Sequence, residues 1–122
     1  MLDSSCGYGN QDTYFANFHN SDSYPIDIIF LKSHERTEQL YKSNLAPGEN
    51  YEQETYFNHQ WMFKRTSSNH YLIANANGIE SDVFEGCQFE AKRNEYLVVT
   101  IFSGNENKGM LKLSMVNIIL LL

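Results

Sequence analysis

Two strands and the turn that joins them are encoded in one stretch of the sequence, Leu45-Ala-Pro-Gly-Glu-Asn-Tyr-Glu-Gln-Glu-Thr-Tyr-Phe-Asn-His-Gln-Trp-Met-Phe-Lys-Arg65. The Pro-Gly pair favours a loop before the first strand, Glu49–Phe57, and Phe57-Asn58 favours a short turn into the second, Gln60–Lys64. Because Tyr51–Thr55 is mostly polar, the first strand is expected to face solvent or to lie at the rim of a sheet.

Other short apolar or aromatic stretches recur between clusters of turn-forming residues. They are Tyr14–Phe18, Ile26–Leu31, His70–Ala74, Val83–Phe89 and Tyr96–Phe102. This spacing predicts an all-β fold, an antiparallel β-sandwich of about seven to eight strands. Tyr96–Phe102 is apolar on both of its alternating faces, which predicts a strand in the middle of a packed layer.

The composition fits a single folded domain. The chain has 122 residues, of which 42% are hydrophobic and 20% charged, so it is too apolar to be disordered. Its net charge of −6 opposes nucleic-acid phosphates and anionic membrane surfaces, and neither is expected as a partner. We expect a flexible N-terminal arm over residues 1–12, the sandwich over 13–104, and an apolar C-terminal segment over 105–122 that forms a final strand or short helix.

Catalytic patterns are missing from the sequence. It contains no nucleophile elbow and no signature around a cysteine, so we do not expect an enzyme. Hard-cation ligand types gather in two regions and give candidate calcium ligands, with ordinary turn chemistry as the alternative explanation. The candidates are Asp12, Asn20, Asp22, Asn105, Glu106 and Asn107. Cys6 and Cys87, the two cysteines of the chain, are either a disulfide or two unrelated thiols.

An aromatic slot is the other candidate site. Alternation places His59, Trp61 and Phe63 on one face, beside Thr55 and Tyr56 of the preceding strand. A slot of this kind suits the rigid, apolar ring of a proline in an extended peptide, and Thr55 and His59 could hydrogen-bond a polar substituent on that ring. The alternative is that Trp61 and Phe63 simply belong to the core.

The same stretch resembles the β domain of the von Hippel-Lindau (VHL) tumour-suppressor family. In that family a Leu-Pro-Pro-Gly loop leads to a His-Ser-Tyr-x-x-His-x-Trp-x-Phe-Arg segment, which residues 45–48 and 54–64 match here. The resemblance implies a VHL β-domain/prealbumin-like sandwich that recognises hydroxylated proline in a peptide, as the substrate-reading part of a ubiquitin ligase. It assigns peptide binding to Phe30, Tyr41, Thr55, Tyr56, His59 and Trp61.

Two departures from the family pattern affect the expected partners. Glu54 replaces a His and adds negative charge beside a site that receives an acidic peptide in the family. Ligase-forming members also carry an α domain that docks on elongin C through a Leu-x-x-x-Cys box. Here Leu111-Lys-Leu-Ser-Met115 stands in that place with Met for Cys, so assembly with elongin C is not expected.

We therefore expect a non-catalytic module that binds a proline- or hydroxyproline-containing peptide and needs no cofactor. The alternative is a secreted or structural VHL-like sandwich that self-associates as a homodimer and binds calcium through its acidic and Asn loops. The first twenty residues lack the pattern of a secretory signal, which slightly favours the cytoplasm, while a signal removed beforehand would allow secretion.

Overall fold

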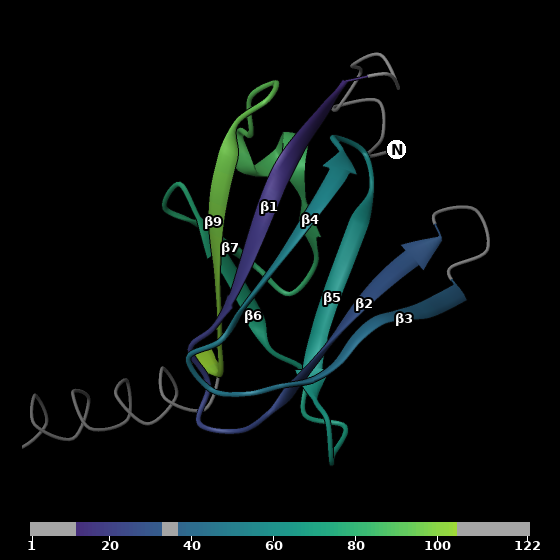
Figure 1. The fold of residues 1–122 in the computed structure, drawn as a ribbon, viewed down its shortest axis with the longest axis vertical. Helices are drawn as coiled ribbons and strands as arrows, with labels where there is room; N and C mark the ends of the chain where they lie inside the picture. Colours follow the sequence, from purple (N-terminus) through teal and green to yellow (C-terminus); the bar gives the residue numbers. More distant parts are fainter. Residues whose placement is uncertain (1–11, 33–36, 105–122) are drawn as a thin grey trace, which may run out of the picture.

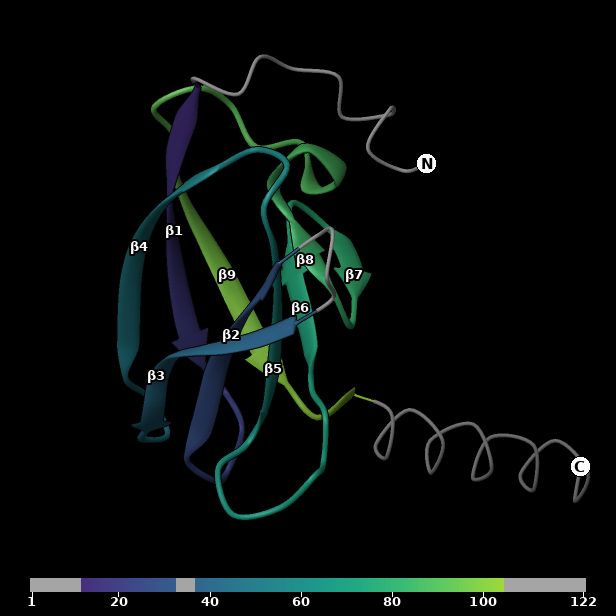
Figure 2. The ribbon, with the colours of Figure 1, turned by 90° about the vertical axis from the view of Figure 1, so that its right-hand side faces the viewer.

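The computed structural model describes residues 12–32 and 37–104, which fold into two packed β-sheets (Figures 1 and 2). In chain order the elements are β1 (Thr13–Asn20), β2 (Ile26–Lys32), β3 (Thr37–Leu45), β4 (Asn50–Tyr56), β5 (Gln60–Arg65), β6 (Ile73–Ala76), β7 (Ile79–Ser81), β8 (Phe84–Glu85), the 3-10 turn η1 (Gly86–Phe89) and β9 (Tyr96–Phe102). Sheet A has the strand order β4-β1-β9-β6-β7, and sheet B has the order β3-β2-β5-β8. The predicted all-β sandwich is confirmed.

The pairing of β1 with β9 is the parallel exception among antiparallel pairs of described strands. β1 is the first and β9 the last of the described strands. A parallel pair needs a long connection, and here that connection consists of all the strands between β1 and β9. The Pro-Gly turn before β4 forms as expected, with Gly48 at a φ of 86° and the Glu49 N–H donating to the Ala46 carbonyl at 2.9 Å.

Aromatic rings from both sheets fill the space between them. Phe18 of β1 lies at the centre, with its ring centroid 5.6 Å from that of Trp61 and 5.2 Å from that of Phe63, both on β5. Phe84 of β8 meets the same ring edge-on at 5.8 Å. Each fully buried side chain of this size contributes about 1.5–3 kcal/mol to folding, so this cluster is a major source of stability.

Only one face of β9 is buried, although both of its alternating faces are apolar. Leu97, Val99 and Ile101 point into the core, but Tyr96 is 54% and Val98 is 49% exposed on the outer face of sheet A. β9 does lie in the middle of its sheet, between β1 and β6. Only one layer covers it, however, so one of its two apolar faces meets solvent among the described residues.

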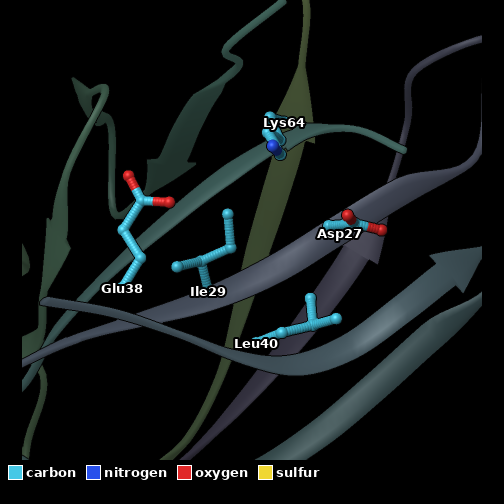
Figure 3. A pocket seen from close by; sticks show the side chains of 5 residues that line it. All are labelled: Asp27, Ile29, Glu38, Leu40 and Lys64. Carbon is cyan, nitrogen blue, oxygen red and sulfur yellow. The ribbon is translucent and has the colours of Figure 1, made fainter. Parts of the chain in front are cut away.

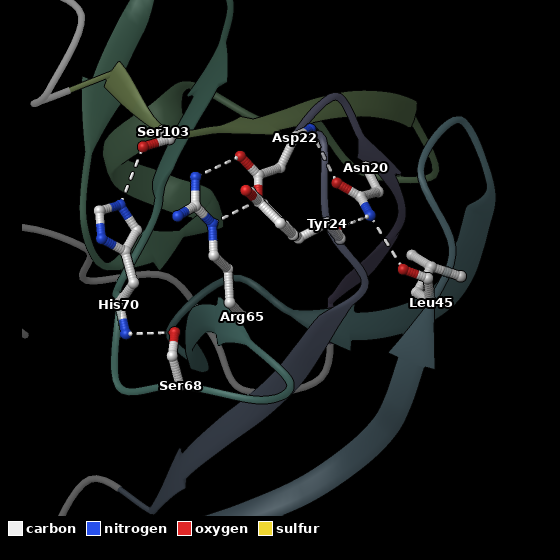
Figure 4. Close-up of polar contacts among 8 residues, drawn as sticks. All are labelled: Asn20, Asp22, Tyr24, Leu45, Arg65, Ser68, His70 and Ser103. Atoms are coloured by element: carbon white, nitrogen blue, oxygen red, sulfur yellow. Dashed lines mark hydrogen bonds and ion pairs between the residues drawn. The ribbon is translucent and has the colours of Figure 1, made fainter.

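Buried polar groups hold the loop between β1 and β2 against both sheets (Figure 4). The Asn20 amide donates to the carbonyls of Tyr24 and Leu45, each at 2.9 Å, and its oxygen accepts from the Asp22 N–H. Both carboxylate oxygens of Asp22 accept from Arg65, at 2.8 and 3.0 Å. Burial alone raises the pKa of Asp22, but the hydrogen bonds and positive charge of Arg65 outweigh it and hold the pKa below its usual value.

Candidate functional site

The six residues assigned to peptide binding come together in one aromatic cluster. They lie on four strands and a turn: Phe30 on β2, Tyr41 on β3, Thr55 and Tyr56 on β4, His59 after the β4–β5 turn, and Trp61 on β5. The Phe30 ring is central, with centroids of Tyr41, His59 and Trp61 at 5.7, 4.9 and 5.2 Å respectively. Tyr41 meets Trp61 edge-on at 4.9 Å, and Tyr56 meets His59 at 5.1 Å.

Trp61 forms the floor of this cluster and is also part of the core. Its side chain is 1% exposed, and its indole Nε1–H donates to the Thr55 hydroxyl at 3.2 Å. Thr55 is itself 3% exposed. A buried indole N–H that lacked an acceptor would cost about 1–3 kcal/mol, so Thr55 stabilises the position of Trp61.

The exposed part of the cluster consists of the side chains above Trp61. Tyr41 and Tyr56 are 41% and 39% exposed, and Phe30 and His59 are half-buried. Three aromatic rings and an imidazole therefore lie above the buried indole. Groups of this kind can hold an apolar ring by contact and a polar substituent by a hydrogen bond from the imidazole.

Local backbone bonds fix the residues on either side of the β4–β5 turn. The His59 N–H donates to the Tyr56 carbonyl at 3.1 Å, which closes the turn between these two rings. From η1, the Cys87 N–H donates to the Phe57 carbonyl at 3.1 Å and anchors the same turn to sheet B. The position of Tyr56 and His59 thus depends on a contact about thirty residues further along the chain.

A β-bulge places Tyr41 in the cluster. Ile29 of β2 pairs with Leu40, whereas Ile28 pairs with Lys42, so β3 has one more residue than β2 between these pairs. The extra residue is Tyr41, whose ring contacts Phe30 and Trp61 on the inner side of sheet B. Sequence reasoning predicted no strand at Thr37–Leu45, and only the resemblance pointed to Tyr41.

Burial lowers the pKa of His59 from its ordinary value of 6.5, which keeps the ring neutral at neutral pH. A neutral imidazole has one nitrogen that donates and one that accepts a hydrogen bond. His59 can therefore bind a hydroxyl group in either direction.

This pKa shift predicts that the protein loses stability as the pH falls below about 6.5. In that range His59 of the unfolded chain takes up a proton while the folded chain resists it, so unfolding is favoured; above that range neither state is protonated. In urea unfolding at pH 7.5, 6.5 and 5.5, the free energy of unfolding should decrease less with falling pH for His59→Gln than for the wild type. Asp22 does not affect this comparison, because its pKa lies below the ordinary value of 3.8 and its contribution to stability is lost only at pH values lower than those tested. Equal slopes for the two proteins would contradict the prediction.

A hollow lies on the face of sheet B opposite to the aromatic cluster (Figure 3). It has a volume of about 170 Å³ and is lined by Asp27, Ile29, Glu38, Leu40 and Lys64. The Asp27 carboxylate is already used, because it accepts hydrogen bonds from the Ser43 hydroxyl, the Asn44 N–H and the Thr66 hydroxyl. No sequence pattern pointed to this hollow, since it depends on the pairing of β2 with β3.

The calcium candidates are dispersed or already engaged. Asn20 and Asp22 make the structural bonds described above, and Asp12 forms an ion pair with Arg93 at 3.2 Å. Asn105, Glu106 and Asn107 lie outside the described residues. Within residues 12–32 and 37–104, no group of three or more His, Cys, Asp or Glu side chains is placed to hold a metal ion. The predicted calcium site stays a prediction.

Cys87 lies in η1, half-buried against the core, and it is not a free thiol. Cys6, the other member of the predicted pair, lies outside the described residues, so the pairing itself stays a prediction. The described part of the chain has no helix with the length and hydropathy needed to cross a bilayer.

Comparison with known families identifies the fold. The model of the VHL beta domain matches residues 13–82, which run from β1 through β7 and include the whole aromatic cluster. The chain belongs to the VHL β-domain family. VHL β domains are protein-interaction modules, and the domain is a non-catalytic recognition fold. No curated protein is similar enough in sequence to count as a match.

Proposed function

We propose that this VHL-like module binds an extended peptide containing proline or 4-hydroxyproline at the aromatic cluster. The observation that carries the proposal is the meeting of Phe30, Tyr41, Tyr56 and His59 above the buried Trp61. A proline ring suits this surface because it is apolar and rigid, and little conformational freedom is lost when it binds.

The edge position of β4 supports an extended ligand. β4 pairs with β1 on one side only, and its other edge is unpaired among the described strands. A peptide that runs along this edge can use the unpaired backbone groups, while its proline lies near Tyr56 at the end of the strand. The proposed binding needs no cofactor and no catalytic group.

Comparing a proline peptide with its 4-hydroxyproline form distinguishes binding of the proline ring from recognition of its hydroxyl group. In a calorimetric titration with peptides that differ only in proline or 4-hydroxyproline, we expect tighter binding of the hydroxylated form. His59→Ala should remove that preference, about a three- to tenfold difference in Kd, because it removes one hydrogen bond to the hydroxyl. Tyr41→Ala should weaken both peptides, since it removes a wall of the slot.

Tyr96→Ala is the matched control, because Tyr96 is an exposed tyrosine on β9 that makes no ring contact with the cluster residues. It should leave both affinities unchanged. The titration is run in EDTA and again in Ca²⁺. Failure of both peptides to bind, together with heat on addition of Ca²⁺, would contradict the proposal and favour the calcium-binding, secreted sandwich. One observation already favours that alternative: Cys87 is not a free thiol, as is usual in oxidising compartments.

A further inference from the structure

The Lys and Arg residues of the described strands all lie on sheet B. The five strands of sheet A contain no Lys or Arg, and their acidic residues are Glu52, Glu54 and Glu80. The strands of sheet B carry Lys32, Lys42, Lys64 and Arg65 together with the acidic residues Asp27, Glu38 and Glu85. A ligand that extends sheet A therefore meets carboxylates, whereas the cations lie on the strands of the other layer.

Glu52 and Glu54 lie on β4, whose outer edge is unpaired among the described strands, beside the aromatic cluster. Both are exposed and point to the outer face of sheet A, away from Thr55, which points inward. Their partners across β1 are the uncharged Asn17 and Phe15. Glu54 accepts a hydrogen bond from the Thr13 hydroxyl at 2.8 Å, which holds its carboxylate near the strand. No cation on β1 compensates either charge.

The edge of β4 would bring ligand side chains opposite these carboxylates. In a strand paired with β4, side chains alternate between faces, and residues on the same face of adjacent strands lie about 4.5–5.5 Å apart at their Cβ atoms. The two ligand residues opposite Glu52 and Glu54 are therefore separated by one residue that points the other way. Because Glu52 and Glu54 precede Tyr56 by four and two positions, these ligand residues lie close in sequence to the bound proline.

We propose that the peptide ligand carries Lys or Arg at two alternate positions, within about five residues of its proline, that face Glu52 and Glu54. This inference rests on the proposed function and adds the charge and register of the ligand. The neutral state of His59 agrees with it, since the cluster then adds no positive charge beside β4 near neutral pH. An acidic ligand would meet repulsion along the same edge.

The test separates register from overall charge, because a protein with a net charge of −6 attracts any basic peptide. One set of hydroxyproline peptides carries two lysines on alternate positions. A second set has the same composition with both lysines moved by one position, and a third has glutamates in place of the lysines. Each set is made with the charges before and after the proline, since β4 can pair with a strand of either direction.

One lysine register should bind about three- to tenfold more tightly than the other, and the glutamate peptides should bind most weakly. The Glu52→Gln/Glu54→Gln variant should lose the difference between registers. The matched control, Glu38→Gln/Glu80→Gln, makes the same change in net charge away from the β4 edge, on β3 and β7, and should retain it.

Equal binding of the two lysine registers, or tighter binding of the glutamate peptides, overturns the charge inference and leaves the peptide-binding function standing. Failure of every peptide, including the uncharged hydroxyproline peptide of the first titration, overturns both. Loss of the register preference in the Glu38→Gln/Glu80→Gln control would also overturn it, because the effect would then come from net charge.

Discussion

Replacing Trp61 with alanine should lower the free energy of unfolding by about 3–5 kcal/mol. The side chain is 1% exposed and packs against Phe18 on the core side and against Phe30 and Tyr41 on the cluster side. Its removal leaves a large cavity between the sheets and takes away the donor that pairs with Thr55. The measurement is urea unfolding followed by far-ultraviolet circular dichroism, because the variant lacks the single tryptophan.

Two companion variants separate packing from the hydrogen bond. Trp61→Phe keeps an aromatic ring but loses the N–H, so it should cost clearly less than the alanine variant. Tyr96→Ala removes an aromatic side chain that is 54% exposed and should cost under about 1 kcal/mol. A loss below about 1 kcal/mol for Trp61→Ala would mean that the indole lines an open slot and does not support the core.

The sequence left open whether Trp61 belongs to the core or to a peptide-binding slot. The tryptophan belongs to the core, and its cluster-side face is covered by Phe30 and Tyr41, whose own outer surfaces are accessible or half-buried. Stability and the proposed binding therefore share one residue. Variants of Tyr41 and His59 are better probes of binding, since neither contributes a fully buried side chain.

Strands with one buried face could be predicted from the sequence, because their apolar residues recur with a period of two. Tyr14, Ala16 and Phe18 of β1 follow this rule, as do Trp61 and Phe63 of β5. β3 has no such pattern, since its residues from Thr37 to Asn44 are exposed or half-buried. Its position depends on pairing with β2, which is a tertiary interaction that local sequence does not encode.

Only the part of the candidate site that is continuous in the sequence could be predicted from the residues alone. Thr55, Tyr56, His59 and Trp61 are neighbours along the chain, so strand alternation and a short turn were enough to group them. Phe30 and Tyr41 join them only through the register of β2 with β3 and β5. The ion pair between Asp22 and Arg65 could not be predicted either, because 43 residues separate the two along the chain.

Gly86→Ala should destabilise the fold by about 1–3 kcal/mol, although it adds only one methyl group. A Cβ at Gly86 would lie 2.5 Å from three atoms of the Tyr14 ring and hydroxyl, closer than real Cβ contacts. Tyr14 cannot easily move away, because it is fully buried and its ring packs against Phe57 at 5.3 Å and Phe84 at 6.4 Å. Burial, and then the negative charge of Glu85, raise the pKa of the Tyr14 hydroxyl far above its ordinary value, as expected for a phenol enclosed in the core.

A double-mutant cycle tests whether the clash is the cause. In a Tyr14→Leu background the ring is gone, so Gly86→Ala should cost much less than in the wild type. Gln88→Ala, an exposed change in the same 3-10 turn, should stay within about 0.5 kcal/mol of the wild type. If Gly86→Ala costs the same in both backgrounds, the loss arises from the backbone of η1 and not from Tyr14.

Because η1 also anchors the β4–β5 turn through Phe57, the clash should weaken peptide binding at Tyr56 and His59 even where the variant still folds.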